Sequence, residues 1–598
     1  MPVHVSVEPP DPVAPPTVAS RVTSRMPLAE GPPPGERVDV VVIGGGINGT
    51  GVARDLALRG LRVVLFERND LAFGASGNSS GMIHGGARYL LQAPKVTESS
   101  SRDSGYIQRI APNLLFRIPF VMPLRSGAQG RVMVELIDAY FRAYDDYQPL
   151  KRGEPHCRLD AGELARLEPG LVGSFVGGVT FDEWGVDGGR LCVLAAVDAI
   201  EHGARVHVHT TVESVARAPG HPEQQGGPRD GRAGPAQTET GYVVTARDRT
   251  SDAVTRVAAR VVVNATGAWS PITAALASVS QERARVRPGK GIHVVLDRRI
   301  TNVAILSEAI DGRQVFLLPW QNVTVVGTTD DDFYGDLDDV SATTDEVRYL
   351  VQGVAKVFPS VRAARAIGTC AGVRPTLYEY GPTEDALSRD HRVVDHALDG
   401  APGLYTLIGG KLASYRMFAQ ELCDQVAPRH FGVTVPCTTH ERPLPGGDGI
   451  PDALAMADAY GVTPVCARRL VYRHGTRALR VLERTARRPA ERDVVCPCEP
   501  VLEAEVRHAV ADELARTVDD VARRTRLGLG ACGGMRCAAR CGQIVAEERG
   551  LPPAQARSMA LQFLERQART RLVALGPQQA QQEALLWAHV RASLGEPG

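Results

Sequence analysis

Residues 38–67 read VDVVVIGGGINGTGVARDLALRGLRVVLFE. Two apolar runs flank a glycine-rich turn and a helical pattern, which is the order of a βαβ unit. The turn fits G-x-G-x-x-G through Gly44, Gly46 and Gly49. In this pattern the glycines permit, in turn, a sharp bend, a close approach of a pyrophosphate and close packing of the helix on the strand. The stretch therefore predicts a parallel α/β sheet with a dinucleotide-binding turn.

Two further features favour a dinucleotide over an ordinary crossover with a glycine-rich turn. The helix after the turn, which includes Asn48 at its start, offers free N–H groups and a positive dipole end to phosphate oxygens. Glu67 ends the second strand, where a carboxylate can accept hydrogen bonds from a ribose diol, and Arg68 follows it.

The loop from Asp70 to Tyr89 is dense in small residues, so that its backbone can press against a flat ring or a phosphate. A flexible surface loop is the alternative interpretation. The residues of this loop predicted to contact the cofactor are Ser79, Ser80, Met82, Ile83 and His84.

Composition limits the class of protein. A chain of 598 residues predicts several domains. Its 68 basic and 68 acidic residues give a net charge of zero, so no overall positive electrostatic field favours binding of nucleic acid. No run of 18 apolar residues occurs, so we expect no transmembrane helix. Residues 1–37 are rich in Pro and Gly and predict a disordered arm without an export signal, and residues 219–241 predict a disordered insertion.

Later strands are expected to return to the same cofactor. The strand at 260–264 ends in Ala265-Thr266-Gly267, and the segment Gly409-Gly410-Lys411 opens a helix at Leu412. Such glycine-to-helix junctions suit an anion or a flavin oxygen. Further strands at 315–319, 324–327 and 404–408 are expected to form a second, mostly antiparallel sheet. The predicted cofactor contacts in these later segments are Val212, Ala265, Gly267, Gly410, Lys411 and Leu412.

Five of the eleven cysteines fall in one short stretch near the C-terminus. Cys496, Cys498, Cys532 and Cys537 form two close pairs, and this set suits a tetrahedral zinc or an iron–sulfur cluster equally well. Spacing alone leaves both open. Cys541 lies one helical turn after Cys537, and we do not interpret it as a ligand.

These motifs resemble those of the FAD-dependent glycerol-3-phosphate dehydrogenase family, and the cysteine segment resembles that of the flavin subunit of the anaerobic enzyme. The resemblance covers residues 38–598. The matching stretches are VIGGGING at 42–49, ALRGLRV at 57–63, HGGARY at 84–89, GVRP at 372–375 and GGKL at 409–412. One departure is Gly81, which stands where the aerobic relatives carry a lysine.

The resemblance implies an α/β chain with a two-dinucleotide-binding FAD fold, in which a Rossmann-like domain and a mostly antiparallel substrate-domain sheet share residues 38–436. A helical connector (437–490), a small α-helical cysteine-rich domain (491–545) and C-terminal helices (546–598) are expected to follow. The cysteine-rich domain resembles bacterioferritin-associated ferredoxin, which favours a 2Fe–2S cluster over zinc.

The implied reaction is oxidation of sn-glycerol 3-phosphate to dihydroxyacetone phosphate by FAD. Electrons would then pass to a quinone through partner subunits, with the chain held peripherally at the cytoplasmic face of the membrane. This chemistry needs cations for the phosphate and the oxyanion, and a base near the C2 hydroxyl. The family implies cations at Arg88, Arg313, Arg374, Arg389 and Lys411, and His293 is the candidate base.

Two other functions compete with this one. The first is a related flavin oxidoreductase that acts on an amine or an amino acid, which would need one arginine for a carboxylate and not several for a phosphate. The second is a non-enzymatic electron-transfer subunit that holds a flavin and a cluster for a partner.

Overall fold

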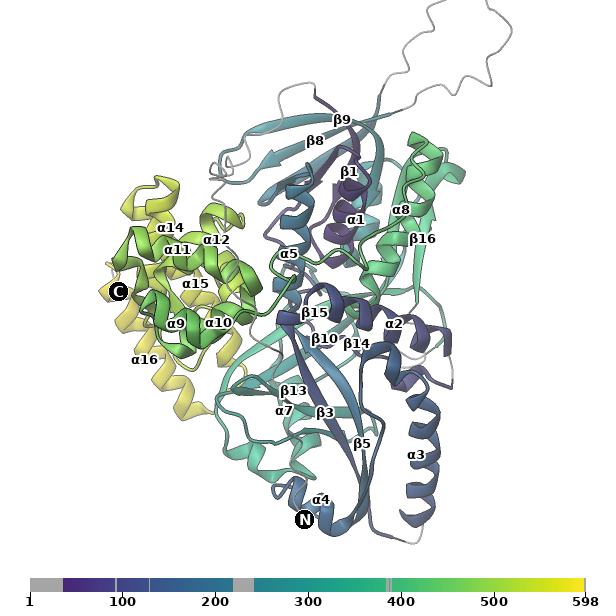
Figure 1. Cartoon of the computed structure of the whole chain (residues 1–598), viewed down its shortest axis with the longest axis vertical. Helices are drawn as coiled ribbons and strands as arrows, with labels where there is room; N and C mark the ends of the chain where they lie inside the picture. Colours follow the sequence, from purple (N-terminus) through teal and green to yellow (C-terminus); the bar gives the residue numbers. More distant parts are fainter. Residues whose placement is uncertain are drawn as a thin grey trace, which may run out of the picture.

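A computed structural model of the chain describes residues 36–595, except for 92–93, 128–129, 219–240, 383–386 and 388–389. Nearly all of the predicted arm (1–35) and of the predicted insertion (219–240) therefore lies outside the described residues. Figure 1 shows two sheets, one above the other, with the C-terminal helices gathered on one side of them.

The first sheet carries the dinucleotide-binding turn. Its core is parallel, in the strand order β17 (Leu404–Gly409), β9 (Val254–Asn264), β1 (Glu36–Ile43), β2 (Val63–Phe66) and β6 (Arg205–His207). Antiparallel strands extend it: β16 (His391–Asp395) pairs with β17, and the hairpin of β7 (Thr210–Arg217) and β8 (Tyr242–Asp248) pairs with β9. Since parallel strands end at one edge, the segments that follow β1, β2, β9 and β17 come together there.

Three helices share a hydrophobic core with this sheet: α1 (Ile47–Leu58), α5 (Gly188–Glu201) and α8 (Tyr415–Phe431). A short helix, α6 (Ser270–Leu276), lies with the hairpin strands in a second core. The strands of the parallel core are therefore buried on both faces, as their valine-rich sequence predicts.

Two expectations about this sheet are wrong. Strand β1 begins at Glu36, so the predicted arm ends two residues too late. The strand at 404–408 does not belong to the second sheet: as β17 it runs parallel to β9, with Leu404 opposite Val262. Every residue of β17 is buried, so its sequence carries no alternation that could identify the neighbouring strand.

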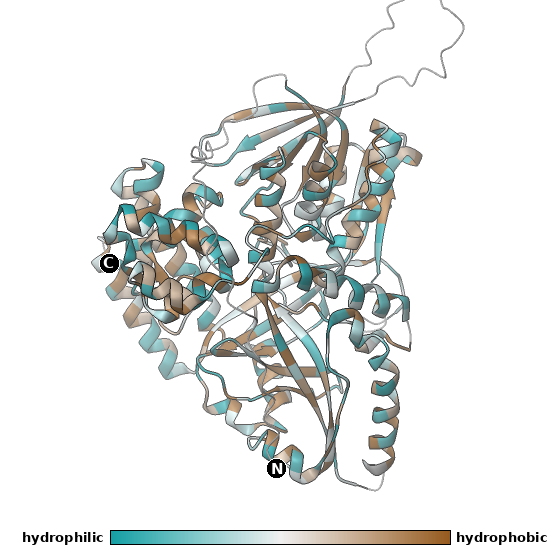
Figure 2. Ribbon diagram, viewed as in Figure 1, coloured by the Kyte–Doolittle hydropathy of each residue, from teal (hydrophilic) through white to brown (hydrophobic). Residues whose placement is uncertain are grey.

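The second sheet is mostly antiparallel, as predicted. Its strands are β14 (Asp331–Asp332), β10 (Val286–Leu296), β13 (Val323–Gly327), β12 (Gln314–Trp320), β11 (Ala304–Glu308), β3 (Leu115–Arg125), β5 (Phe175–Val186) and β4 (Arg158–Asp160), with β15 (Ala366–Leu377) paired to β10. Around it lie α2 (Pro94–Ile110), α3 (Gly130–Asp145), α4 (Ala161–Leu167) and α7 (Thr344–Ala355). Figure 2 shows hydrophobic residues along the long strands of this sheet.

The C-terminal region is helical apart from a short hairpin of β18 (Val494–Cys496) and β19 (Val501–Leu502). Its helices are α9 (Ala453–Tyr460), α10 (Pro464–His474), α11 (Ala478–Arg487), α12 (Glu503–Asp512), α13 (Val518–Thr525), α14 (Ala538–Arg549), α15 (Pro553–Leu572) and α16 (Pro577–Ser593). Leu502 packs with α9–α11, and Phe563 of α15 packs with the cysteine segment. The division at 490 and 545 stays a prediction.

None of the described helices combines the length and the apolar composition that crossing a membrane requires.

Candidate functional site

The glycine turn between β1 and α1 has the conformation that its sequence predicts. Gly44 adopts φ +109°, and a Cβ there would lie 2.7 Å from the carbonyl oxygen of Ala265. A Cβ at Gly49 would lie 1.9 Å from the Gly44 oxygen, so Gly49 holds the helix against the turn. Gly46 differs, because a Cβ there would approach only the Ser76 hydroxyl, at 3.3 Å. Gly46 therefore leaves room on its open side for a ligand.

Polar side chains brace this turn. Glu67 Oε2 accepts the Gly45 N–H at 2.6 Å, and Oε1 accepts the Asn69 N–H at 2.7 Å. Burial raises the pKa of the Glu67 carboxyl, although both N–H groups oppose the shift. Ser76, for which the sequence alone gave no signal, accepts the Ile47 N–H at 3.0 Å. Its Oγ caps the first turn of α1 from a different loop.

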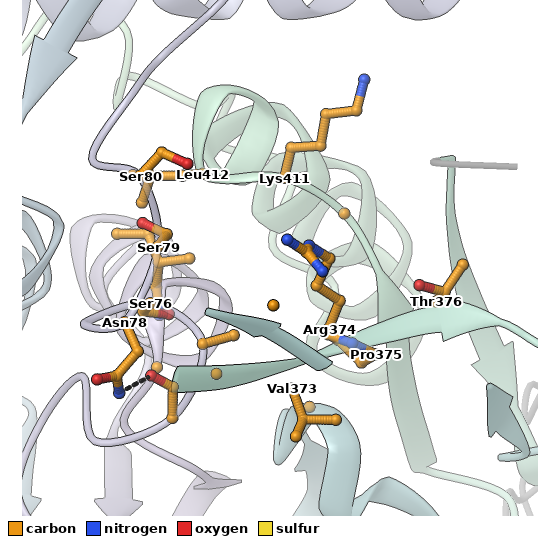
Figure 3. A pocket seen from close by; sticks show the side chains of 18 of the residues that line it. Ser76, Asn78, Ser79, Ser80, Val373, Arg374, Pro375, Thr376, Lys411 and Leu412 are labelled. Atoms are coloured by element: carbon orange, nitrogen blue, oxygen red, sulfur yellow. Dashed lines mark hydrogen bonds between the residues drawn. The ribbon is translucent and has the colours of Figure 1, made fainter. Parts of the chain in front are cut away.

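A cavity of about 1180 Å³ opens on this turn and extends to the second sheet. A space of this size suits a large cofactor together with a small substrate. The predicted residues that line it are Gly44, Gly46, Asn48, Glu67, Arg68, Ser79, Ser80, Met82, His84, Val212, Ala265, Gly267, His293, Arg313, Arg374, Gly410, Lys411 and Leu412. Figure 3 shows Ser76, Asn78, Ser79 and Ser80 on one side and Arg374 on β15 on the other.

Four predicted site residues do not appear in the cavity wall. Gly49 lies beneath the turn, and Ile83 is fully buried in a core with Ile107 and Leu191. Neither is part of the cavity wall, so direct contact of either residue with a cofactor stays a prediction. Arg88 belongs to a short 3-10 helix, but its side chain is outside the described part of the structure, as is the whole of Arg389.

Arg374 is anchored in the cavity by its neighbours. Its Nη1 donates to Asp330 Oδ1 at 2.8 Å, and its Nη2 donates to Thr328 Oγ1 at 3.2 Å. A Cβ at Gly291, in the adjacent strand β10, would lie 2.2 Å from Nη2, so only glycine leaves space for this guanidinium group. Arg313 donates to the backbone oxygen of Asp330 at 2.8 Å. Asp330, which no sequence motif marks, thus orients both arginines.

A third cation, Lys411, lines the same cavity from the first sheet. Both preceding glycines, Gly409 and Gly410, have positive φ angles, and this backbone turns the chain from β17 into the cavity. The ammonium group lies 3.9 Å from the ring centroid of Tyr89. Figure 3 shows Lys411 and Arg374 reaching the cavity from different elements.

His293 is buried on β10, where its Nε2 lies 2.8 Å from Ser80 Oγ. Burial, and to a lesser degree the charge of Arg374, lowers the pKa of His293 to about 3. The imidazole is therefore neutral at physiological pH, which is the form that can accept a proton.

The loop at 84–86 rests on a buried network that the sequence did not predict. Glu183 lines the cavity and accepts the Gly85 N–H at 3.0 Å. Lys151 Nζ donates to Glu183 at 2.7 Å, and the Tyr144 hydroxyl donates to it at 2.9 Å. A Cβ at Gly85 would lie 2.4 Å from that hydroxyl. No sequence signal points to this network, because its members lie on α3, η3 (Gln148–Lys151) and β5.

The four predicted metal ligands come together as two pairs. The thiol of Cys537 hydrogen-bonds to Cys496, and Cys498 pairs in the same way with Cys532. The Cys537 contact and the N–H groups of Gly528, Glu499 and Cys498 lower the pKa of Cys496 to about 6 against the effect of burial. Cys496 therefore favours the thiolate, the form that binds metals. In contrast, the contact with Cys496 raises the pKa of Cys537, and burial raises the pKa of Cys498. Cys541 is buried in the hydrophobic core.

Within the described chain, one other set of metal-capable side chains meets: His474, His508 and Glu513. Arg190 of α5 already fills it, since its Nη2 lies 2.9 Å from His474 Nδ1 and 2.6 Å from Glu513 Oε1. A guanidinium group in this position repels a metal cation. The cluster is therefore a buried ion-pair network that joins the C-terminal helices to the first sheet.

Comparisons with known proteins agree with this geometry. A profile described as FAD dependent oxidoreductase matches residues 39–416, which is more than half of the chain. A second, described as the C-terminal domain of alpha-glycerophosphate oxidase, matches residues 437–556. The fold and the cavity thus define the class as FAD-dependent oxidoreductases.

Similar proteins identify the family within this class of oxidoreductases. The chain is 32% identical over 513 residues to the A1 subunit of the anaerobic glycerol-3-phosphate dehydrogenase of Haloferax volcanii, covering 85% of this chain and 83% of that protein. It is 34% identical over 526 residues to a glycerol-3-phosphate dehydrogenase of Mycobacterium leprae, covering 86% and 85%. The chain belongs to the FAD-dependent glycerol-3-phosphate dehydrogenase family.

A solved structure shares the fold. The glycerol-3-phosphate dehydrogenase of Bacillus halodurans, complexed with FAD, aligns with a TM-score of 0.66 at 22% identity. The alignment covers 90% of this chain and 96% of that chain.

Proposed function

We propose that this chain oxidises sn-glycerol 3-phosphate to dihydroxyacetone phosphate. The observation that carries the proposal is Arg374, a guanidinium group that lines the cavity and is fixed by Asp330. Arg313 and Lys411 line the same cavity, so its wall carries three cations. A phosphate dianion suits several cations, whereas the carboxylate of an amino acid needs one bidentate arginine.

The roles of the residues follow from their positions. Arg313 and Lys411 would bind the phosphate, and Arg374 would stabilise negative charge that develops on the C2 oxygen. His293 would take the proton of the C2 hydroxyl as a general base. Its low pKa makes it a weak base alone, but a bound dianion would raise that pKa. Arg88 and Arg389 stay predictions.

The cavity fits FAD. Gly46 leaves its open side clear, the N-terminus of α1 faces the cavity, and Glu67 lies at the end of β2. When bound, FAD would accept the hydride from substrate C2. Gly44, Gly46, Asn48 and the serines of the 76–80 loop would hold its phosphates and ring.

The cysteine site fits a 2Fe–2S cluster better than zinc. A zinc tetrahedron with Zn–S bonds of about 2.3 Å would bring all four sulfurs within roughly 4 Å of one another. Among the described residues, no three cysteine sulfurs lie within 4.8 Å of one another. The two thiol pairs, Cys496 with Cys537 and Cys498 with Cys532, match a cluster with one pair of ligands on each iron.

We further propose that electrons leave this chain for a quinone, as in glycerol-3-phosphate dehydrogenase (quinone), EC 1.1.5.3. The relative from Haloferax volcanii is named as one subunit of an enzyme, which supports the existence of partner subunits. We propose that these partners hold the chain at the cytoplasmic face of the membrane. Salt or high pH should release the chain from membranes. Rapid quinone reduction by the purified chain alone would contradict the need for partners.

The decisive experiment is anaerobic mixing of the purified chain with glycerol 3-phosphate in a stopped-flow spectrometer. We expect the flavin absorbance to bleach within the mixing experiment, and glycine or sarcosine to leave it unchanged. Bleaching by an amine or an amino acid instead would favour the alternative oxidoreductase. No bleaching by any of them would favour the non-enzymatic subunit.

A single variant separates the two sites. Cys537→Ser should lose the cluster spectrum and electron delivery to the acceptor, while glycerol 3-phosphate still bleaches the flavin. Cys541→Ser is the matched control, because Cys541 is also buried but is not paired with another thiol. Loss of flavin reduction in a folded Cys537→Ser protein would refute the separation.

A further inference from the structure

A tryptophan lies between the flavin cavity and the cysteine site. Trp320 ends β12 and is 8% exposed. A Cβ at Gly81 would lie 3.3 Å from its indole Nε1. Gly81 stands between Ser80 and Met82, both of which line the cavity. The edge of the indole therefore abuts the outer side of the cavity wall.

A cation from the C-terminal helical region, Arg526, lies over the face of the same indole. The guanidinium carbon of Arg526 lies 4.3 Å from the ring centroid of Trp320, a cation–π distance. Arg526 Nε donates to Glu499 Oε2 at 3.3 Å. Glu499 directly follows the ligand Cys498, and its own N–H points to the sulfur of Cys496. One side chain thus connects the indole to the cysteine site.

A second arginine completes this charge group. Arg469 of α10 lies 3.9 Å from Glu499 Oε2, and it donates a hydrogen bond to Gln321, the neighbour of Trp320. The Glu499 side chain is only 7% exposed, and both arginine side chains are less than 15% exposed. Two positive charges and one negative charge therefore sit beside Cys498 with little water to screen them.

We infer that Arg526, held in place by Trp320, is a positioning residue that raises the reduction potential of the cluster bound by the four cysteines. The inference rests on the proposed function, because it requires the 2Fe–2S cluster. Reduction adds one negative charge to a cluster, and a nearby cation stabilises that charge. The Trp320 contact would fix this cation between the cavity wall at Gly81 and the cysteine site at Glu499.

The test is a potentiometric titration of the full-length holoprotein, with the reduced cluster followed by EPR and the flavin by absorbance. Arg526→Gln should make the cluster at least tenfold harder to reduce, which is about 59 mV for a one-electron couple. The flavin potential should not change. Arg526→Lys should retain most of the potential, because it keeps the charge.

Three further variants test whether the position of the charge matters, and not only its removal. Arg569→Gln makes the same charge change in an ion pair on α15 whose arginine side chain is 72% exposed, and it should leave the potential unchanged. Trp320→Leu keeps every charge but frees Arg526, and we expect a smaller shift in the same direction, which Trp320→Phe should largely reverse.

The outcomes separate this inference from the proposed function. A wild-type protein without iron refutes the cluster and this inference together. If the wild-type protein holds the cluster, but the cluster has the same potential in Arg526→Gln and in Arg569→Gln, this inference alone is refuted. If Arg526→Gln assembles no cluster, the cluster potentials of Arg526→Lys and Trp320→Leu test the inference in its place. An unchanged potential in Trp320→Leu overturns the role of the indole.

Discussion

The flavin cavity takes its walls from segments that lie far apart in the sequence, from the turn at 44–48 to the junction at 409–413. The cysteine site takes all four thiols from the single stretch between Cys496 and Cys537. Two sheets bring the first set together through strand order, whereas a short hairpin and two loops suffice for the second. The two sites thus depend on very different amounts of folded structure.

The flavin half of the chain, which forms the cavity, and the cysteine half, which holds the four thiols, are nevertheless not independent. Arg524 of α13 donates to Asp70 Oδ2 at 2.7 Å, and both side chains are almost completely buried. Asp70 begins the loop that lines the cavity, and the neighbouring Arg523 lies over Phe73 of that loop, 5.6 Å from its ring centroid. We therefore expect mutations to separate hydride transfer from onward electron transfer, whereas mutations at this interface should also weaken the retention of FAD.

The largest effect is expected from the glycine turn. Gly46→Val should yield a folded protein without FAD, because a Cβ at Gly46 clashes with no protein backbone but fills the open side of the turn. Absorbance of the purified protein measures the flavin, and iron content measures the cluster, which should remain. Gly49→Val is the contrasting variant: its Cβ would meet backbone at 1.9 Å, so we expect loss of the fold itself. Full flavin in Gly46→Val would refute the assignment of the turn.

A substitution in the C-terminal helices, where they contact the flavin cavity, should weaken the binding of FAD. Arg524→Ala leaves Asp70 buried, with Arg523 at 3.1 Å as its remaining ion-pair partner among the described residues. We expect a loss of about 3 kcal/mol in the free energy of unfolding, at the low end for a broken buried pair, with release of FAD. Denaturant titration and flavin fluorescence measure both.

The matched control for that variant is Arg566→Ala, which breaks a more exposed pair with Asp519. It should cost less than about 1 kcal/mol. Equal stability and equal flavin retention in the two variants would mean that the halves are modular after all.

A substitution in the substrate wall should spare both cofactors. Arg374→Ala should slow flavin reduction by roughly a hundredfold, or about 3 kcal/mol of transition-state stabilisation. The flavin and cluster spectra should stay intact, since Arg374 contacts Asp330 and Thr328 and no cysteine. Stopped-flow bleaching is the measurement, and Arg348→Ala, an exposed ion pair on α7, is the control. An unchanged rate would remove Arg374 from the mechanism.

The last comparison distinguishes the two halves by the pH dependence of their stability. Burial lowers the pKa of His508, but Asp512 and Glu513 outweigh it and raise the pKa to about 9. Between pH 6.5 and 9 the folded state therefore binds more protons than the unfolded state, and stability falls as pH rises, by up to about 1.4 kcal/mol per pH unit. His508→Gln should remove this slope.

His293 gives the opposite slope in the flavin half. Its pKa is lowered to about 3, so that below pH 6.5 the unfolded state binds more protons and stability falls as pH falls. His293→Gln should flatten the acid limb only. Denaturant titrations across pH measure both slopes, and a shared loss of both slopes in either variant would contradict the division.

Local patterns predicted much of this protein. The glycine turn, the helix after it and the acidic residue at the end of β2 all depend on contacts within one short stretch of chain. Glycine spacing determines which positions can approach a phosphate. Such features are readable because no distant residue is needed to form them.

Tertiary structure decided the rest. Because every residue of β17 is buried, its hydrophobic pattern could not show which of the two sheets it joins. Its pairing with β9 brought Lys411 to the cavity. Asp330, the partner of Arg374, lies in the loop between β13 and β14, and Glu183, the partner of Gly85, lies on β5. No local signal in the sequence specifies the strand pairing that brings these partners together. The contact of Arg526 with Trp320 joins two halves of the chain. In each case the deciding interaction spans a long separation in sequence, so it exists only once both sheets have formed and the C-terminal helices have packed against them.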